Sequence, residues 1–254
     1  MIPIKSASEI ERMRRACAAA AEVLRNVAAL VQPGRTTAEL NDAAGELIRK
    51  MGGKSPFLGY RGYPGHVCVS VNEEVVHGIP GNRKIQYGDI VSLDVGIIID
   101  GYVGDNATTV AVGVMKPRTA ELLAVTERAL YAGIAQAREG RRVGDISHAV
   151  QMTVEAHGFS AVREFVGHGV GKKMHEEPQI PNFGKAGTGP KLKRGMTLAI
   201  EPMINAGRHD VEVLSDGWTV VTADGLPSAH FEHTVLVTED EAEILTWQKK
   251  TQSR

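Results

Sequence analysis

The chain has 254 residues, of which 43% are hydrophobic and 23% charged, with a formal net charge of −1 at pH 7. This composition is typical of a soluble globular protein, and the near-neutral balance offers no basic surface for nucleic acid or for an anionic membrane. No apolar run approaches the roughly 18 residues that span a bilayer, and the N-terminal residues lack the apolar core of a signal peptide, so we expect a cytoplasmic protein.

Two amphipathic helices are predicted at the start of the chain. Ser8 and Glu11 have the spacing of a capping box, and apolar residues follow at steps of three and four as far as a Pro-Gly pair. Thr36 and Glu39 form a second capping-box pattern, and the helix that follows ends at the glycine pair beginning with Gly52. We expect the apolar stripes of both helices to pack in the core.

The same order of elements recurs in the second half of the chain. One helical pattern runs from Pro117 to Gly140 and a second ends at Gly158, and the interval between these two glycines equals that between Gly34 and Gly52. Such a repeat indicates two similar halves related by a pseudo-two-fold axis, and binding sites often lie between parts of this kind. We expect a single domain over 1–254, with halves at about 6–115 and 116–245.

Between the helices the sequence has the alternating or continuous apolar patterns of β-strands. The expected strands are 67–71, 91–112, 161–166, 196–201, 218–222 and 230–237. Paired helices together with strands joined mainly by hairpins predict an α+β fold, in which two helix pairs cover one side of a curved antiparallel sheet.

The segment 91–112 contains two aspartates within runs of valine and isoleucine. Asp100-Gly101 favours a two-residue hairpin turn, because both central residues of such a turn need a positive φ. The register that follows pairs Ile99 with Tyr102, Gly96 with Asp105 and Asp94 with Ala107. Asp94 and Asp105 then lie on one face as diagonal neighbours, with their backbones about 7–8 Å apart. Their carboxylates reach toward each other and repel unless a cation or proton lies between them. Alternatively, Asp94 ends a bend and Asp105 begins a loop, but aspartate is depleted in strands and is rarely buried unpaired.

Three more potential metal ligands occur in the second half. His168 lies in a glycine-rich string that lacks the Gly-Lys-Ser/Thr ending of a phosphate-binding loop. Glu201 ends one predicted strand and Glu232 lies in another, and each alone is also compatible with a surface carboxylate. With Asp94 and Asp105 they supply four carboxylates and one imidazole from separate segments, which is a suitable donor set for two divalent cations bridged by water.

Longer strings in the chain resemble the type I methionine aminopeptidases, which have the pita-bread fold, over about residues 4–245. The matching strings are Gly62–Pro80, the two hairpin aspartates, Gly167–Pro178, Ile200–Met203 and Phe231–Thr234. The resemblance implies the metal ligands Asp94, Asp105, His168, Glu201 and Glu232. It also implies that His77 and His175 contact the substrate or the tetrahedral intermediate.

The chemistry implied by the resemblance is hydrolysis by metal-activated water. Two divalent cations lower the pKa of a bridging water and polarise the scissile carbonyl, while Glu201 takes and returns the proton. His175 donates toward the oxyanion, and His77 holds the scissile amide or its leaving nitrogen. The donor types do not distinguish Co, Mn, Fe and Zn.

Similarity also places a set of soft and aromatic side chains around the methionine of the substrate: Tyr60, Tyr63, Cys68, Met174 and Trp218. Met174 departs from the family pattern, because an aromatic residue commonly precedes the histidine at this point. Arg61 is a charge at a position where none is expected. Both departures bear on the pocket shape and on the preference for the second residue of the substrate.

The expected function is removal of the initiator methionine from nascent proteins whose second residue is small. The expected partners are N-terminal peptides and, transiently, the ribosome, with no nucleic acid, no membrane and a monomeric chain. One alternative is a proline-directed aminopeptidase or dipeptidase of the same fold, although such chains usually carry an additional N-terminal domain. The other is a non-catalytic pita-bread binding module, although such relatives lose metal ligands and often gain basic extensions, whereas the tail 247–254 is short.

Overall fold

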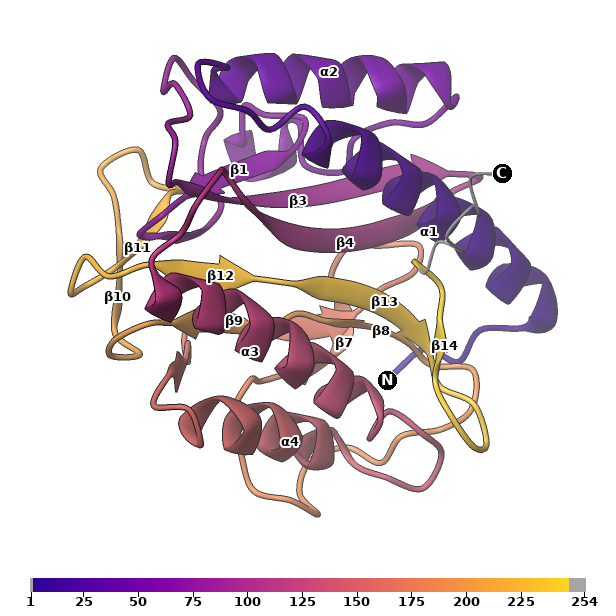
Figure 1. Cartoon of the computed structure of the whole chain (residues 1–254). Coiled ribbons are helices and arrows are strands. Elements are labelled where there is room, and N and C mark those ends of the chain that lie inside the picture. Colours follow the sequence, from indigo (N-terminus) through magenta and orange to yellow (C-terminus); the bar gives the residue numbers. More distant parts are fainter. Residues whose placement is uncertain (1, 247–254) are drawn as a thin grey trace, which may run out of the picture.

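Two helix pairs lie on one side of a curved antiparallel sheet (Figure 1). The structure, a computed structural model, describes residues 2–246. Its helices are α1 (Ala7–Ala28), α2 (Thr37–Lys50), α3 (Pro117–Ile134) and α4 (Val143–Glu155), with a short 3-10 helix, η1 (Tyr60–Gly62). As the repeat predicts, α1 packs on α2 and α3 packs on α4. None of the described helices is long and apolar enough to cross a membrane.

The central eight-stranded sheet contains strands from both halves of the chain, in the order β1-β3-β4-β13-β8-β6-β7, with β14 beside β13. Its strands are β1 (Cys68–Val71), β3 (Ile90–Ile99), β4 (Tyr102–Ala111), β6 (Gly167–Gly169), β7 (Glu176–Ile180), β8 (Thr197–Ile200), β13 (Glu232–Leu236) and β14 (Glu243–Ile244). Because β4 pairs with β13, the sheet is continuous from the first half to the second.

Two three-stranded sheets, ordered β10-β11-β2 and β12-β9-β5, complete the described β-structure. Their strands are β2 (Glu74–Val76), β5 (Ser160–Ala161), β9 (Met203–Asn205), β10 (Val211–Val213), β11 (Val220–Thr222) and β12 (Ser228–His230). Strand β12 leads directly into β13, so this region connects the smaller sheet with the centre of the larger one.

The β3–β4 hairpin has the register that its turn predicts. Asp100 and Gly101 both have positive φ, of 51° and 76°. The ladder pairs Ile99 with Tyr102, Gly96 with Asp105 and Asp94 with Ala107. The predicted placement of Asp94 and Asp105 on one face of the hairpin is therefore confirmed.

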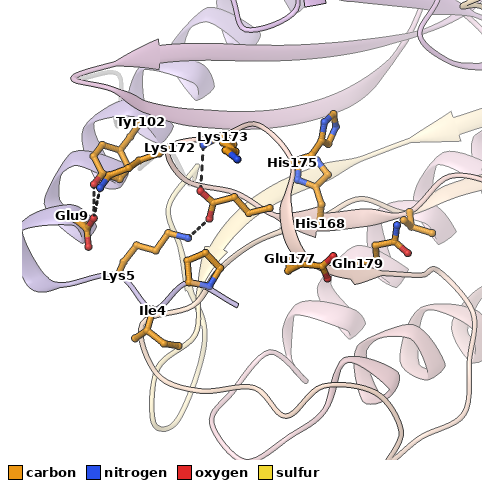
Figure 2. Close-up of a pocket in the computed structure, with 13 residues that line it drawn as sticks. Ile4, Lys5, Glu9, Tyr102, His168, Lys172, Lys173, His175, Glu177 and Gln179 are labelled. Carbon is orange, nitrogen blue, oxygen red and sulfur yellow. Dashed lines mark hydrogen bonds and ion pairs between the residues drawn. The ribbon is translucent and has the colours of Figure 1, made fainter. Parts of the chain in front are cut away.

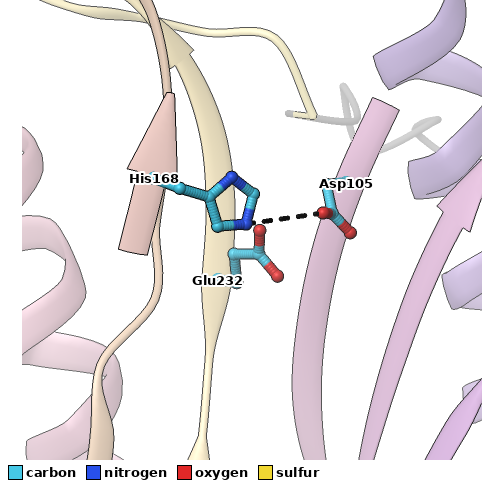
Figure 3. A group of neighbouring side chains, drawn as sticks. All are labelled: Asp105, His168 and Glu232. Carbon is cyan, nitrogen blue, oxygen red and sulfur yellow. Dashed lines mark ion pairs between the residues drawn. The ribbon is translucent and has the colours of Figure 1, made fainter. Parts of the chain in front are cut away.

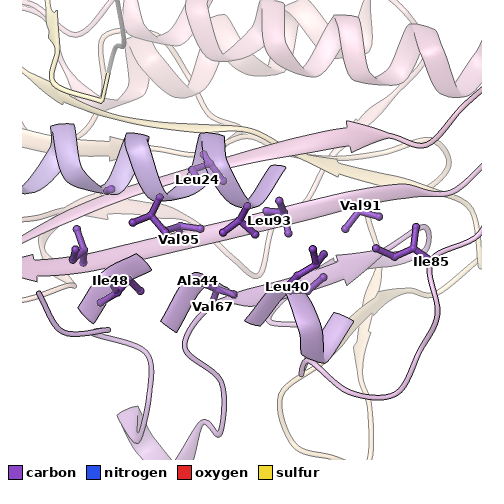
Figure 4. Close-up of a cluster of buried hydrophobic side chains, with 14 of the residues drawn as sticks. Leu24, Leu40, Ala44, Ile48, Val67, Ile85, Val91, Leu93 and Val95 are labelled. Atoms are coloured by element: carbon purple, nitrogen blue, oxygen red, sulfur yellow. The ribbon is translucent and has the colours of Figure 1, made fainter. Parts of the chain in front are cut away.

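Each half has an apolar core between its helices and the sheet. In the first half, Leu24, Leu40 and Ile48 pack with Leu93 and Val95 (Figure 4). Since side chains alternate along a strand, the residue between Leu93 and Val95 faces away from the helices. The corresponding core of the second half includes Leu130, Ile146, Leu198 and Val235. Residues of α1, α3, β4 and β13 line one cavity of about 280 Å³, so both helix pairs cover the same face of the sheet.

The predicted start of the first helix is wrong by two residues. Ser6, not Ser8, caps α1: its Oγ accepts a hydrogen bond from the Glu9 backbone, and the Glu9 carboxylate accepts one from the Ser6 N–H. The backbone N–H of Lys5 donates to the carbonyl of Gly195 at 2.8 Å, which fixes the extended segment immediately before Ser6. The second predicted capping box, at the start of α2, is confirmed.

Other predicted element limits also differ from the structure. α1 ends at Ala28 and α3 at Ile134, several residues before the predicted glycine stops. The predicted strand 161–166 is reduced to the end of β5, because pairing with β9 covers only two residues and the chain then turns outward at the exposed Arg163. Six strands not predicted from the sequence, β2, β6, β7, β9, β10 and β14, have two to five residues, which is too short for a clear alternation.

Candidate active site

A cavity of about 370 Å³ lies on the face of the central sheet opposite the helices and is lined by residues from both halves of the chain. Every residue predicted for metal binding, catalysis or substrate binding lines this cavity: Tyr60, Tyr63, Cys68, His77, Asp94, Asp105, His168, Met174, His175, Glu201, Trp218 and Glu232. Their convergence in one cavity is observed. Their individual roles remain predictions.

Three of the predicted metal ligands form a compact group. Asp105 of β4, His168 of β6 and Glu232 of β13 are all buried, and each offers one ligand atom within 4.8 Å of the others (Figure 3). Glu201, just after β8, adds a carboxylate oxygen 3.3 Å from Nε2 of His168. Asp94 lies beside this group on β3, across the hairpin from Asp105. The donors therefore come from five strand or strand-end positions that only the folded sheet brings together.

The orientation of His168 suits a metal ligand. Its Nδ1 lies 3.0 Å from the carbonyl oxygen of Gly169, to which a protonated Nδ1 donates. The lone pair of Nε2 then faces Asp105 and Glu201, at 4.0 and 3.3 Å. Burial, followed by the neighbouring His175, lowers the pKa of His168 to about 3, so the imidazole is neutral and free to coordinate.

The carboxylates are poorly satisfied by the protein itself. Among the described residues, buried oxygens of Asp94, Asp105 and Glu232 have no hydrogen-bond partner. Burial raises the pKa of Asp105 to about 7. Burial and neighbouring carboxylates also raise the pKa values of Asp94, Glu201 and Glu232 well above their usual range. Since unpaired buried charges are costly, this cluster fits divalent cations, which would supply the missing positive charge and the missing oxygen contacts.

His77 and His175 line the same cavity. His77 has φ 60°, in the left-handed region, and its ring meets Phe165 and Trp218 edge-on at 5.4 and 6.1 Å. A Cβ on the following residue, Gly78, would collide with the carbonyl of Val69, so the chain passes very close to β1 here. This contact fixes the strained backbone that directs His77 into the cavity, a conformation that costs roughly 1–3 kcal/mol.

His175 contacts both the metal cluster and the cavity wall. Its ring centroid lies 4.5 Å from that of His168, and its Nδ1 lies 3.2 Å from the hydroxyl of Tyr60. Burial lowers the pKa of His175, and the positive charge of Arg61 lowers it further. Burial, followed by His175, lowers the pKa of His77 to about 4. Both imidazoles are therefore neutral near pH 7, and each carries one N–H donor.

A separate, larger cavity of about 670 Å³ adjoins the site and shares His168 and His175 with it (Figure 2). In this second cavity Lys5 forms an ion pair with Glu176 at 2.6 Å, and both side chains are nearly buried. The Glu176 carboxylate also accepts a hydrogen bond from the backbone of Lys173. These contacts hold the loop that carries His175.

One end of the site is apolar and soft. Tyr63 and Cys68 are buried there with Phe57, and Met174 and Trp218 pack against them. The Tyr63 hydroxyl donates to the carbonyl of Gly78 at 2.9 Å, so its polar end is satisfied by the backbone. Burial raises the pKa of the Cys68 thiol well above its usual range, which keeps the thiol neutral. Polarizable and aromatic walls of this kind suit a thioether side chain.

Several lining residues were not singled out in the sequence: Phe57, Val76, Phe165, Val166, Met203 and His230. Two of them carried a detectable signal. Met203 lies two residues after Glu201 and His230 two residues before Glu232, and a spacing of two places side chains on one face of an extended chain. The others lie in loops or on short strands, where no periodicity identifies them.

The fold and this donor set define a metallopeptidase. The chain belongs to metallopeptidase family M24, which it matches over residues 11–239. Its similar relatives within this family are methionine aminopeptidases. It is 50% identical to methionine aminopeptidase 1 of Bacillus subtilis over 246 residues, which is 97% of this chain and 99% of that protein.

The solved structures agree with this assignment. The crystal structure of methionine aminopeptidase from Thermotoga maritima has a TM-score of 0.96 and 50% sequence identity, and the match covers 98% of this chain and 100% of that chain. The predicted pita-bread α+β fold is thus confirmed. The prolidase from Pyrococcus furiosus, with a TM-score of 0.80 and 23% identity, shares the fold, and the match covers 97% of this chain and 66% of that chain.

Proposed function

We propose that this protein is a metal-dependent aminopeptidase that removes the N-terminal methionine from peptides and nascent proteins. The observation that carries the proposal is a buried Asp105–His168–Glu232 cluster next to a soft apolar pocket in a single cavity. Relatives that are 50% identical over nearly the whole chain are methionine aminopeptidases, which supports the same activity.

The metal would be held by Asp94, Asp105, His168, Glu201 and Glu232. We propose two divalent cations, because four carboxylates and one imidazole exceed the needs of one small cation, and Co, Mn, Fe and Zn all accept such donors. When bound, such cations lower the pKa of water and polarise a carbonyl group. This chain supplies the oxygen-rich donor set and excludes bulk water from it.

The remaining steps concern protons and orientation. With the positive charge of bound cations beside it, the Glu201 carboxylate would be ionised, and it could accept a proton from the attacking water and return it to the leaving amine. We propose that the Tyr60 hydroxyl donates to Nδ1 of His175, 3.2 Å away, which places the imidazole proton on Nε2. That N–H then donates to the oxygen of the scissile carbonyl as negative charge develops there.

His77 lines the same cavity as His175, and we assign it to the leaving side of the scissile bond. Its neutral ring can hold the amide nitrogen of the second residue, and the aromatic contacts with Phe165 and Trp218 fix its orientation. The methionine side chain occupies the pocket formed by Tyr63, Cys68 and Met174. A small second residue of the substrate stays a prediction, based on the resemblance to methionine aminopeptidases.

The activity is tested with Met-Ala-Ser and Ala-Pro-Gly as substrates for the purified protein. Release of methionine from Met-Ala-Ser should require added Mn²⁺ or Co²⁺, stop with a chelator, and be lost in Glu201→Ala. Preferential cleavage of Ala-Pro-Gly would indicate a proline-directed enzyme instead. Binding of less than one metal per chain under saturating Mn²⁺, with no peptidase activity, would indicate a binding module.

The monomeric state, the transient ribosome contact and the cytoplasmic location stay predictions. All five ligand types are present, which favours an enzyme over a binding module. The fold alone is shared with the prolidase, whose greater length agrees with the additional domain expected of proline-directed relatives.

A further inference from the structure

His230 is a buried imidazole that faces the metal-ligand cluster without being one of the predicted ligands. It is the last residue of β12, its side chain lines the cavity, and it is 2% exposed. Its Nε2 atom is buried and has no hydrogen-bond partner among residues 2–246. The carboxylate oxygen Oε2 of Glu201 lies 3.7 Å from this nitrogen.

The backbone of His230 is held firmly. The Thr109 hydroxyl donates to the His230 carbonyl and accepts from the His230 N–H, both at 2.9 Å. The same hydroxyl lies 2.8 Å from Ser92 Oγ, which can donate to it. His230 is also paired with Met203 in the β12–β9 ladder. The imidazole is therefore carried on a rigid support that connects β12 with the hairpin bearing Asp94 and Asp105.

Glu201 is placed between two imidazoles with different roles. Nε2 of His168 lies 3.3 Å from Oε1, and Nε2 of His230 lies 3.7 Å from Oε2. The Nδ1 atom of His168 is engaged by the Gly169 carbonyl, so its Nε2 presents a lone pair. With cations bound, the Glu201 carboxylate would be ionised and would only accept hydrogen bonds, so the nitrogen of His230 that faces Oε2 would have a partner only if it carries the proton. An imidazole has such an N–H whether it is neutral or protonated.

We propose that His230 is a positioning residue whose Nε2–H donates a hydrogen bond to Oε2 of Glu201 and fixes the orientation of that carboxylate. A short rotation of either side chain brings the two atoms from 3.7 Å into hydrogen-bond range. The bond would keep Oε1 directed at the metal cluster and would hold Glu201 ready to accept a proton. This inference rests on the proposed function insofar as Glu201 is a metal ligand and base.

Partners one layer outside the metal ligands commonly tune metal affinity. Without the donor, the Glu201 side chain can rotate away from the cluster. Metal binding must then fix the orientation of this side chain, and the lost side-chain entropy reduces the affinity for the metal. We therefore expect the loss of the donor to weaken metal binding and to lower kcat more than it raises KM.

The first test reads the tautomer directly. Nitrogen-15 NMR of histidine-labelled protein, saturated with Mg²⁺ as a diamagnetic cation, should show the Nε2–H tautomer for the signal that disappears in His230→Gln. A signal from the Nδ1–H tautomer would overturn the proposal, because Nε2 would then be unable to donate to Glu201. This measurement needs no peptide and no activity.

The second test compares His230→Gln, which retains an N–H donor, with His230→Leu, which has none. Titration with Mn²⁺ should show affinity weakened roughly 10–100-fold in His230→Leu and recovered to within about threefold of the parent in His230→Gln. The kcat for Met-Ala-Ser should follow the same order. His148→Gln, on α4 and outside the cavity, should behave like the parent protein.

Unchanged Mn²⁺ affinity and kcat in a folded His230→Leu would overturn the proposal, and so would equal losses in both variants, since equal losses would indicate a packing role. Circular dichroism checks that each variant is folded. If His230→Leu does not fold, the His230 tautomer measured in the parent protein tests the proposal by itself: Nε2–H supports it and Nδ1–H overturns it. A parent protein that binds Mn²⁺ but releases no methionine contradicts the proposed function while leaving both binding measurements interpretable.

Discussion

Lys5 and Glu176 form an ion pair of 2.6 Å between the start of the chain and the residue that follows His175. Their side chains are only 5% and 10% exposed. A Cβ at Gly171 would lie 2.7 Å from both Glu176 Oε1 and the Lys5 side chain, so the glycine leaves the space that the pair occupies. The N-terminal segment thus stabilises the loop that carries a predicted catalytic residue, although it lies far from that loop in sequence.

Replacing Lys5 by methionine should destabilise the protein and reduce its activity. Removing one partner leaves the Glu176 carboxylate buried without its counter-ion, which costs about 3–5 kcal/mol. Thermal unfolding should show a clearly lower Tm, and kcat for Met-Ala-Ser should fall because His175 is less well held. Lys172→Met is the control, because the Lys172 side chain is 66% exposed and its pair with Glu9 should contribute little. Equal Tm values for the two variants would contradict the structural role of Lys5.

The metal-free protein should become more stable, relative to Asp105→Asn, as the pH falls through about 7. Burial raises the pKa of Asp105 to about 7 in the folded protein, against about 3.9 in an unfolded chain. A folded pKa above the unfolded one means that stability is fully present below the unfolded pKa and is lost as the pH rises through the folded value. Above pH 7 the charged Asp105 therefore destabilises the metal-free fold.

The measurement is the difference in Tm between Asp105→Asn and the parent protein, both stripped of metal, from pH 8 to pH 5. The variant should be the more stable of the two at pH 8, and its advantage should shrink as the pH falls. Buried neutral histidines, whose pKa values are lowered, make the folded protein less stable as the pH falls. Both proteins contain these histidines, so the difference in Tm removes most of their contribution. Saturating Mn²⁺ should reverse the order and favour the parent. A constant difference across this range would refute the assigned pKa shift.

The parts of the site that could be predicted from local sequence are those set by short-range rules. The Asp100-Gly101 turn determines the hairpin register, and with it the common face of Asp94 and Asp105, because a two-residue turn leaves one pairing. The capping box at Thr36 is equally local. At the first helix, Ser6 and Ser8 both offer the pattern, and contacts of Lys5 with distant residues decide between them.

The convergence of the second-half ligands could not be derived from pattern alone. His168, Glu201 and Glu232 meet Asp105 through pairing of β13 with β4 and of β8 with β6, which are contacts between residues far apart in the chain. The resemblance to a known family supplied that placement. His230 lies two residues before Glu232, but β12 and β13 belong to different sheets, so the spacing alone does not establish that both side chains face one cavity.

Arg61→Met should move the acid limb of the pH profile to higher pH. Burial is the larger cause of the lowered pKa of His175, and the charge of Arg61 is the second. Removing that charge leaves the burial effect and raises the pKa of His175 toward its ordinary value. Since the neutral imidazole is the active form, kcat/KM should begin to fall at a higher pH in the variant than in the parent.

The comparison is best made at low ionic strength, where charge effects are least screened. Arg83→Met is a suitable control, because Arg83 pairs with Glu74 outside the cavity. The two profiles should converge at high salt. An acid limb that does not move in Arg61→Met would show that this charge does not act on the titrating group.

The last prediction concerns the close packing of α1 against the hairpin beside Asp105. A Cβ at Gly104 would collide with the carbonyl of Ala16 and lie 2.6 Å from the backbone nitrogen of Cys17, so Gly104→Ala forces the helix and β4 apart. We expect a loss of about 1–3 kcal/mol in the free energy of unfolding, as for other overpacked sites, together with weaker Mn²⁺ binding because Asp105 is the next residue. Gly81→Ala, where nothing lies within 4 Å of the added carbon, should change neither quantity appreciably. Denaturant unfolding and Mn²⁺ titration of both variants give the comparison. A Gly104→Ala variant that loses stability but keeps full Mn²⁺ affinity would show that the helix contact supports the fold without setting the position of Asp105.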